Sequence, residues 1–359
     1  MASKRQAAHP GAVAAAAVAL AGAAAGAKLV HGRRAAAARA TADRVYRLRR
    51  DELVADGIRR IVRGQLDSAH EQLDGAHEQL DGASERRLGE AVHETRKHLK
   101  RLRAVLRLTR GAIGEQAYER ESSAFRTAGR RLSAGRDATV LVQTLEGLCE
   151  RFAEELSPTA SAGLREQLTE DHERSLTAMA QGGADIRGAL AAIDEARLRA
   201  PGWSFATGGF GALGPGMRRI YRRGRRRMRK ACSDPTTENL HEARKRVKDL
   251  WYAAQIMEPA APKRMEKLAS DAHRVADLLD DDHDLAVLRD YAEGHARCFE
   301  DDRERQALLA VIDARRRALQ RKALKRGRRL YERSPKRFVT KIERGWVKRA
   351  GERPRPGCA

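Results

Sequence analysis

The sequence predicts an all-α protein that contains an internal duplication, and three observations support this fold class. Alanine, leucine, arginine and glutamate dominate the 359 residues, aromatic residues make up only 4% of them, and β-branched runs are scarce, which favours helices over strands. Apolar residues recur along most of the chain at the helical period of about 3.6 residues. A segment around His93 returns 148 residues later around His241.

The first 45 residues are predicted to form a low-complexity tail, either disordered or loosely helical. An uncharged, alanine-dominated run from Gly11 to Ala27 stands between basic residues. The run is at the short limit for a membrane span, and alanine is barely apolar enough to insert. It also lacks the apolar core of a signal peptide. A weak association of this tail with membranes stays open as an alternative.

The first half of the chain then begins with a basic amphipathic segment, in which Arg59 and Arg63 share one helical face. Next, the heptapeptide Ala-His-Glu-Gln-Leu-Asp-Gly occurs twice in tandem over residues 69–82. A unit of seven residues is close to two helical turns, so it can extend a helix. Its histidines, His70 and His77, are too weak a signal for a metal site and are expected to be solvent-exposed.

The segment around His93 reads as an amphipathic helix with one densely basic face. At about 100° per residue, its apolar positions gather on another face, roughly 120° away. The basic face comprises His93, Arg96, Lys97, Lys100, Arg103 and Arg107.

Two glycine-rich breaks divide the chain after this helix. Gly111–Gly114 predicts a turn, after which residues 125–132, with Arg126, lead into a long helical pattern that ends near Arg199. Residues 201–216 hold two prolines and six glycines and are predicted to be a linker. Within them, Gly209-Phe-Gly-Ala-Leu-Gly214 matches the dinucleotide-binding fingerprint, but no strand precedes it, so we interpret it as part of the linker.

The second half repeats this order. Its opening helix carries a basic face that includes Arg218, Arg219, Arg222 and Arg226. A turn is predicted over residues 233–237. The helix after this turn carries a basic face of His241, Arg244, Lys245, Lys248 and Tyr252.

The end of the chain continues the helical pattern. Arg274 lies where the first half has Arg126, again 148 residues earlier. The acidic run Asp280–Asp284 is predicted to cap a helix rather than to bind a metal, because acidic residues stabilise helix N-termini. Residues 303–348 are predicted to form one or two long basic helices, and residues 351–359 a frayed tail.

The paired His-Glu-x-Arg-Lys helices resemble the CHAD family, the conserved histidine α-helical domain. The run from His241 to Tyr252 is especially similar to the second-half helix of that family, and the resemblance covers about Asp51 to Lys348. This family is often fused to a triphosphate-tunnel (CYTH) domain with a Glu-x-Glu-x-Lys strand. The nearest match, Glu119-Arg-Glu121, lacks the lysine, so we expect a stand-alone CHAD protein.

The resemblance implies two pseudo-symmetric helical bundles, residues 46–200 and 217–350, that face each other across a basic central channel. It also implies inorganic polyphosphate as the ligand and polyphosphate granules as a destination. The residues themselves agree with a polyanionic partner, because the net charge is +23 and like charges on one helical face are unfavourable unless an anion neutralises them.

We therefore expect non-catalytic binding of polyphosphate. Arginine offers forked donors and lysine a mobile charge, and both suit phosphate oxygens. The two histidines are read as ligands or as positioning groups, with a purely structural role as the alternative. The candidate residues are His93, Arg96, Lys97, Lys100, Arg103, Arg107, His241, Arg244, Lys245, Lys248, Arg59, Arg63, Arg218, Arg219, Arg222, Arg226, Arg126 and Arg274.

Binding to the backbone of RNA or DNA is the alternative function. It is disfavoured because few aromatic side chains could stack on bases and no known recognition motif occurs. No enzyme activity, cofactor or metal is expected, because the sequence offers no nucleophile with a partner base and no P-loop. The four cysteines lie far apart without a metal or disulfide pattern, which favours a cytoplasmic setting.

Overall fold

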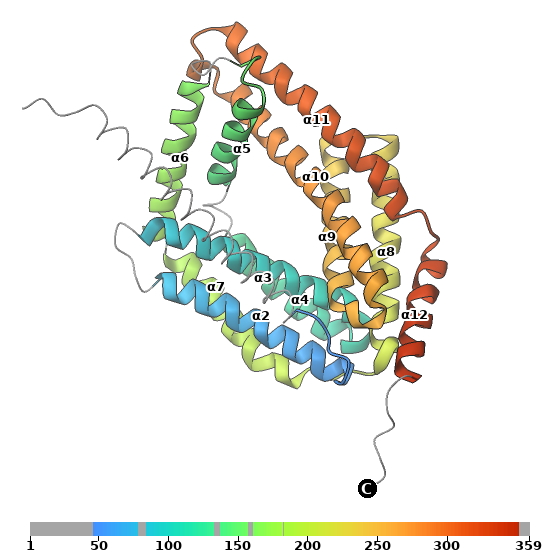
Figure 1. Cartoon of the computed structure of the whole chain (residues 1–359). Coiled ribbons are helices and arrows are strands. Elements are labelled where there is room, and N and C mark those ends of the chain that lie inside the picture. Colours follow the sequence, from blue (N-terminus) through green and yellow to red (C-terminus); the bar gives the residue numbers. More distant parts are fainter. Residues whose placement is uncertain (1–45, 78–83, 133–136, 157–160, 182, 352–359) are drawn as a thin grey trace, which may run out of the picture. The chain divides into compact units, whose positions relative to one another are not determined.

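In the computed structural model, residues 46–77, 84–132, 137–156, 161–181 and 183–351 are described, and those from Arg47 onward form one compact unit. The described residues form α-helices and short 3₁₀ turns without strands, which confirms the all-α prediction (Figure 1). The α-helices are α2 (Val54–His77), α3 (Ser84–Ile113), α4 (Glu115–Arg131), α5 (Asp137–Arg151), α6 (Ala162–Gln181), α7 (Gly183–Arg199), α8 (Gly209–Ser233), α9 (Thr237–Ile256), α10 (Pro262–Gly294), α11 (Asp302–Leu330) and α12 (Pro335–Gly351).

Helix α3 is packed on two sides by helices of the first half. It lies along α2 and α4, and α7 covers the other side of both α2 and α4 (Figure 1). The apolar face predicted for α3 is buried, including Val92, Leu99, Leu102 and Leu106. Burying each such side chain stabilises the fold by about 2 kcal/mol, and it leaves the opposite, basic face of α3 outside this core.

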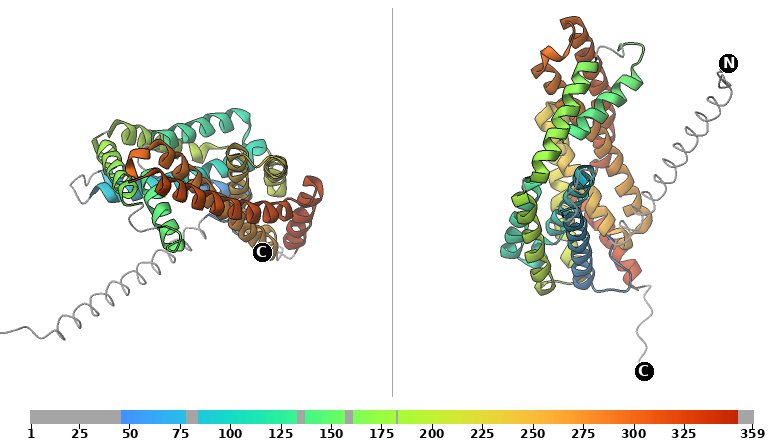
Figure 2. Two further views of the ribbon diagram at one scale, coloured as in Figure 1. Left: turned by 90° about the horizontal axis from the view of Figure 1, so that it is seen from above. Right: turned by 90° about the vertical axis from the view of Figure 1, so that its left-hand side faces the viewer.

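Helix α9 holds the matching place in the second half. It packs between α8 and α10, while α10 and α11 run side by side (Figure 1, Figure 2). Leu240, Ala243, Val247 and Leu250 form the buried face of α9. The hydroxyl of Thr236 accepts the N–H of Asn239 at 3.3 Å, which caps the helix where the turn was predicted.

A further apolar core crosses the boundary between the two halves. Helices α5 and α6, from the first half, share this core with α10 and α11, from the second half. Its buried members include Leu145, Leu164, Leu168, Leu288 and Ile312. The sequence predicted one long helical pattern that ends near Arg199. In the structure this region is divided into three helices, α5, α6 and α7.

The predicted linker 201–216 is wrong in its second part, because α8 already begins at Gly209. Glycine and proline have poor helix propensity, but here tertiary packing outweighs it. A Cβ atom added to Gly216 would lie 1.7 Å from the carbonyl oxygen of Leu108. Only glycine lets α8 approach α3 so closely, and this contact joins the two halves of the chain.

The predicted helix cap at Asp280–Asp284 is also wrong. Helix α10 runs without a break from Pro262 to Gly294, so the acidic run lies in its middle. Its carboxylates meet basic side chains of neighbouring helices instead: Asp280 pairs with Lys248 of α9, and Asp282 with Arg316 of α11. The C-terminal prediction is confirmed in its two-helix form, α11 and α12.

Several predictions concern residues outside the described part of the chain. The tail 1–45, most of the second heptapeptide and the end 352–359 belong to this group. The internal duplication and the central channel stay predictions. In the part of the chain that the structure covers, no helix has the length and apolar character needed to cross a membrane.

Candidate functional site

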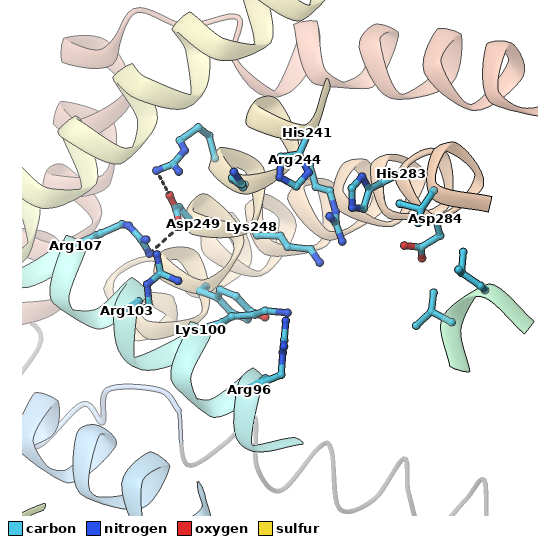
Figure 3. Close-up of a pocket in the computed structure, with 16 residues that line it drawn as sticks. Arg96, Lys100, Arg103, Arg107, His241, Arg244, Lys248, Asp249, His283 and Asp284 are labelled. Carbon is cyan, nitrogen blue, oxygen red and sulfur yellow. Dashed lines mark hydrogen bonds and ion pairs between the residues drawn. The ribbon is translucent and has the colours of Figure 1, made fainter. Parts of the chain in front are cut away.

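A cavity of about 410 Å³ lies between α3, α5, α9 and α10 (Figure 3). We call it the basic cavity, because eight of its lining residues are lysine or arginine and two are aspartate. Its lining consists of Arg96, Lys100, Arg103, Arg107, Val140, Leu141, His241, Arg244, Lys245, Arg246, Lys248, Asp249, Tyr252, His283, Asp284 and Val287.

The cations of this cavity come from both copies of the repeated motif. Residues spaced three or four apart share a helical face, so the burial of the apolar face of α3 aims its basic face away from the core. The same reasoning holds for α9. Figure 3 shows Arg96 and Lys100 of α3 pointing towards the same space as Lys248 of α9. Eight of the predicted residues thus surround one cavity.

Two aspartates already pair with four of the cationic groups at the cavity. Asp249 pairs with Arg107 at 3.0 Å and with Arg246 at 2.8 Å. Asp280 pairs with Lys248 at 2.7 Å and with Arg244. Burial alone would raise the pKa of Asp280, but the two cations outweigh burial and the pKa lies below its ordinary value. The Asp280 carboxylate is therefore charged near neutral pH.

Arg103 shows how crowded the positive charge is. Burial and the neighbouring Arg107 lower the pKa of the Arg103 guanidinium to about 10, and the exposed Arg126 of α4 adds to the effect. The Nε of Arg103 is buried and has no hydrogen-bond partner among the described residues. An anion in the cavity would relieve this repulsion and supply an acceptor.

Two histidines lie together in the cavity wall. The ring centroids of His241 and His283 are 4.7 Å apart, and within the described part of the chain each Nδ1 is buried without a partner. Burial, Lys245 and Arg244 lower the pKa of His241. Burial, Arg244 and His241 lower the pKa of His283 to about 4. Both rings are therefore neutral at pH 7 in the ligand-free protein.

The other predicted residues do not line the basic cavity. His93 is exposed on α3, and Lys97 beside it pairs with Glu94 at 2.9 Å. Arg59 donates from Nη2 to the carbonyl oxygen of Trp203 at 2.8 Å, so it ties α2 to the turn after α7. This group also includes Arg63, Arg126, Arg218, Arg226 and Arg274, which are exposed.

Arg219 and Arg222 lie elsewhere, in a second pocket of about 220 Å³ between α3, α4, α8 and α9. Helical periodicity grouped them with the others because it assigns residues to a helical face but not to a particular cavity.

The sequence did not identify four ionisable residues that line the basic cavity as candidates: Arg246, Asp249, His283 and Asp284. Asp249 carries a readable signal, because the first copy of the motif has Arg101 at that position.

Neither the cavity nor its surroundings resemble a metal centre. Among the described residues, no group of three or more His, Cys, Asp or Glu side chains is arranged to hold a metal ion. Cys149, Cys232 and Cys298 are free thiols.

Comparison with known proteins gives one match. The family model described as CHAD domain matches residues 67–293, which is more than half of the chain and extends from α2 to the end of α10. The match includes both basic helices, α3 and α9, and every residue that lines the basic cavity. No curated protein matches the chain.

Proposed function

The chain belongs to the CHAD family, and we propose that it binds inorganic polyphosphate in the basic cavity without catalysing a reaction. The observation that carries the proposal is the meeting of two basic helical faces, from α3 and α9, at one cavity. CHAD domains are associated with polyphosphate-related proteins. The same contacts would bring the protein to polyphosphate granules.

The arrangement of the cations supports a linear polyanion. Arg96, Lys100, Arg103 and Arg107 form a row along α3 that is about 16 Å long at a rise of 1.5 Å per residue. Lys245 and Lys248 of α9 face the same space. A chain of phosphates carries negative charge along its whole length, so it can satisfy such a row, whereas a single phosphate would meet only part of it.

The lining residues favour binding over chemistry. Among the described residues of the cavity wall there is no serine, threonine or cysteine that could act as a nucleophile. Burial, together with the cations around them, lowers the pKa values of the two histidines. The N–H of a neutral ring can donate a hydrogen bond to a phosphate oxygen, which supports a positioning role.

Nucleic acid is the other polyanion to be tested. Stacking of bases on aromatic rings contributes roughly 1–3 kcal/mol per base to single-strand binding. Among the described residues that line the cavity, Tyr252 is the one aromatic side chain other than histidine. Polyphosphate has no bases, so the shortage of aromatic side chains does not weaken its binding. The cavity should therefore discriminate in favour of polyphosphate.

Competition decides between the two ligands. Fluorescence anisotropy would follow labelled long-chain polyphosphate on the full-length protein, with unlabelled polyphosphate or single-stranded RNA of equal total charge as competitor. Ionic strength must be matched, because phosphate contacts are salt-dependent. Polyphosphate should compete much more strongly than RNA. Equal competition would contradict the proposal and favour a general polyanion-binding or RNA-binding function.

A further inference from the structure

A second basic pocket lies directly behind the basic cavity. Its volume is about 220 Å³, and its lining adds arginines from α8 to those of α3 and α9. Arg219 supports its role as an anion site: one of its terminal nitrogens, Nη2, is buried and has no hydrogen-bond partner in the described part of the chain. The lining consists of Arg107, Arg110, Tyr118, Arg219, Ile220, Arg222, Arg223, Arg246 and Asp249.

Three residues line both the basic cavity and the second pocket: Arg107, Arg246 and Asp249. They form one ion-paired group, which we call the Asp249 cluster. The Asp249 carboxylate accepts from Arg107 of α3 and from Arg246 of α9, at 3.0 and 2.8 Å (Figure 3). All three side chains are largely buried, so water screens these charges weakly. The cluster is thus the wall between the two pockets.

The carboxylate of Asp249 occupies the position that an anionic ligand would take. It already pairs with two guanidinium groups, and a phosphate that approached the wall would meet a fixed negative charge. Like charges repel each other strongly when they are brought together in a partly buried site. The first copy of the motif has Arg101 where the second has Asp249, so only the second copy places a negative charge at this position.

We propose that Asp249 is a specificity-determining residue that confines bound polyphosphate to the basic cavity and keeps it out of the second pocket. The proposal rests on the proposed function, because it concerns how far the same ligand extends. In the native protein the bound phosphates end at the Asp249 cluster. Without the carboxylate, the two pockets would form one continuous cationic site.

The first test is the variant Asp249→Asn, which keeps the shape of the side chain and removes its charge. Isothermal titration would compare tripolyphosphate with long-chain polyphosphate. The variant should bind long-chain polyphosphate about tenfold more tightly than the native protein does. Its affinity for tripolyphosphate should change by less than about threefold, because only the long chain extends past the wall. The control is Asp313→Asn, which changes the net charge equally but lies on α11, where Asp313 pairs with Arg289. The control should leave the preference for chain length unchanged.

A second test needs no change at Asp249 and therefore stands even if that variant does not fold. Arg223 is exposed and lines the second pocket but not the basic cavity. In the native background, Arg223→Gln should change long-chain affinity by less than about twofold. In the Asp249→Asn background, it should remove most of the gained affinity, and such non-additivity shows that the two sites have become one.

Each outcome decides a different question. A native protein that binds no polyphosphate would overturn both the proposed function and this inference. Native binding with equal gains for short and long chains in Asp249→Asn, or with no gain, would overturn the inference alone. A large loss of long-chain affinity from Arg223→Gln in the native background would do the same, because the ligand would then already reach the second pocket.

Discussion

The close approach of the two halves of the chain at Gly216 offers a sharp test of the architecture. In Gly216→Ala, the new Cβ would lie 1.7 Å from the Leu108 carbonyl oxygen and 2.5 Å from its carbon. Contacts below 3.0 Å essentially never occur for real Cβ atoms, so α8 and α3 must move apart by more than about 1 Å. Backbone atoms cannot give way as a flexible side chain can.

The expected cost can be worked out from two opposing terms. Overpacking costs about 3 kcal/mol, and the better helix propensity of alanine returns about 1 kcal/mol, so Gly216→Ala should be destabilised by about 2 kcal/mol. Gly211 is the matched control in the same helix, because its added Cβ would meet nothing closer than 3.7 Å. Gly211→Ala should therefore gain up to about 1 kcal/mol from propensity alone.

Urea unfolding followed by circular dichroism measures both variants, and the pair should differ by about 3 kcal/mol. Leu108 directly follows Arg107, which lines the basic cavity, so Gly216→Ala should also weaken polyphosphate binding more than Gly211→Ala does. Equal stability of the two variants would refute the close contact of α8 with α3.

Three further predictions concern histidines and a helix cap. Burial lowers the pKa of His98, which contacts Gln65, to about 4. The contribution of neutral His98 to the free energy of unfolding is therefore complete above about pH 6.5. It is lost as the pH falls towards 4, which lowers stability by about 3 kcal/mol. Unfolding measured at pH 7 and at pH 4.5 should show a smaller loss of stability in His98→Gln than in the native protein. An anion near His241 favours its protonated form, so affinity should rise from pH 8 to 5.5. Titrations with polyphosphate should show that affinity rises less with falling pH in His241→Gln than in the native protein. His93→Gln should behave like the native protein, because His93 does not line the cavity. Thr236→Ala removes the cap of α9 and should cost about 1 kcal/mol in thermal unfolding.

The sequence predicted the basic helical faces well because helical periodicity is a local property. Arg96, Lys100, Arg244 and Lys248 lie on the faces that a turn of about 100° per residue assigns to them. The buried apolar positions opposite them follow from the same rule. The repeat added the expectation that the two faces have related roles.

The acidic residues of the site could not be placed in the same way. Asp280 was read as a helix cap, but its partners are Arg244 and Lys248 of another helix. Such pairing is set by tertiary packing, which no periodicity encodes. The glycines before Met217 posed the opposite problem: their low helix propensity predicted a linker, whereas Gly216 is required within α8 for contact with α3.

The most direct test of the central claim is the salt dependence of polyphosphate affinity in a double variant. Lys100→Gln with Lys248→Gln removes one charge from each side of the basic cavity. The matched control is Lys322→Gln with Lys325→Gln, which removes the same charge from exposed positions of α11.

By analogy with nucleic acids, each lost phosphate contact should lower the slope of log affinity against log salt by about 0.9. We expect the cavity variant to bind polyphosphate more weakly, and the magnitude of its slope to fall by close to twice this amount. The affinity and the slope of the control should change little. If both double variants lose affinity and slope equally, polyphosphate is held by the overall positive charge of the protein, and the basic cavity is not its site.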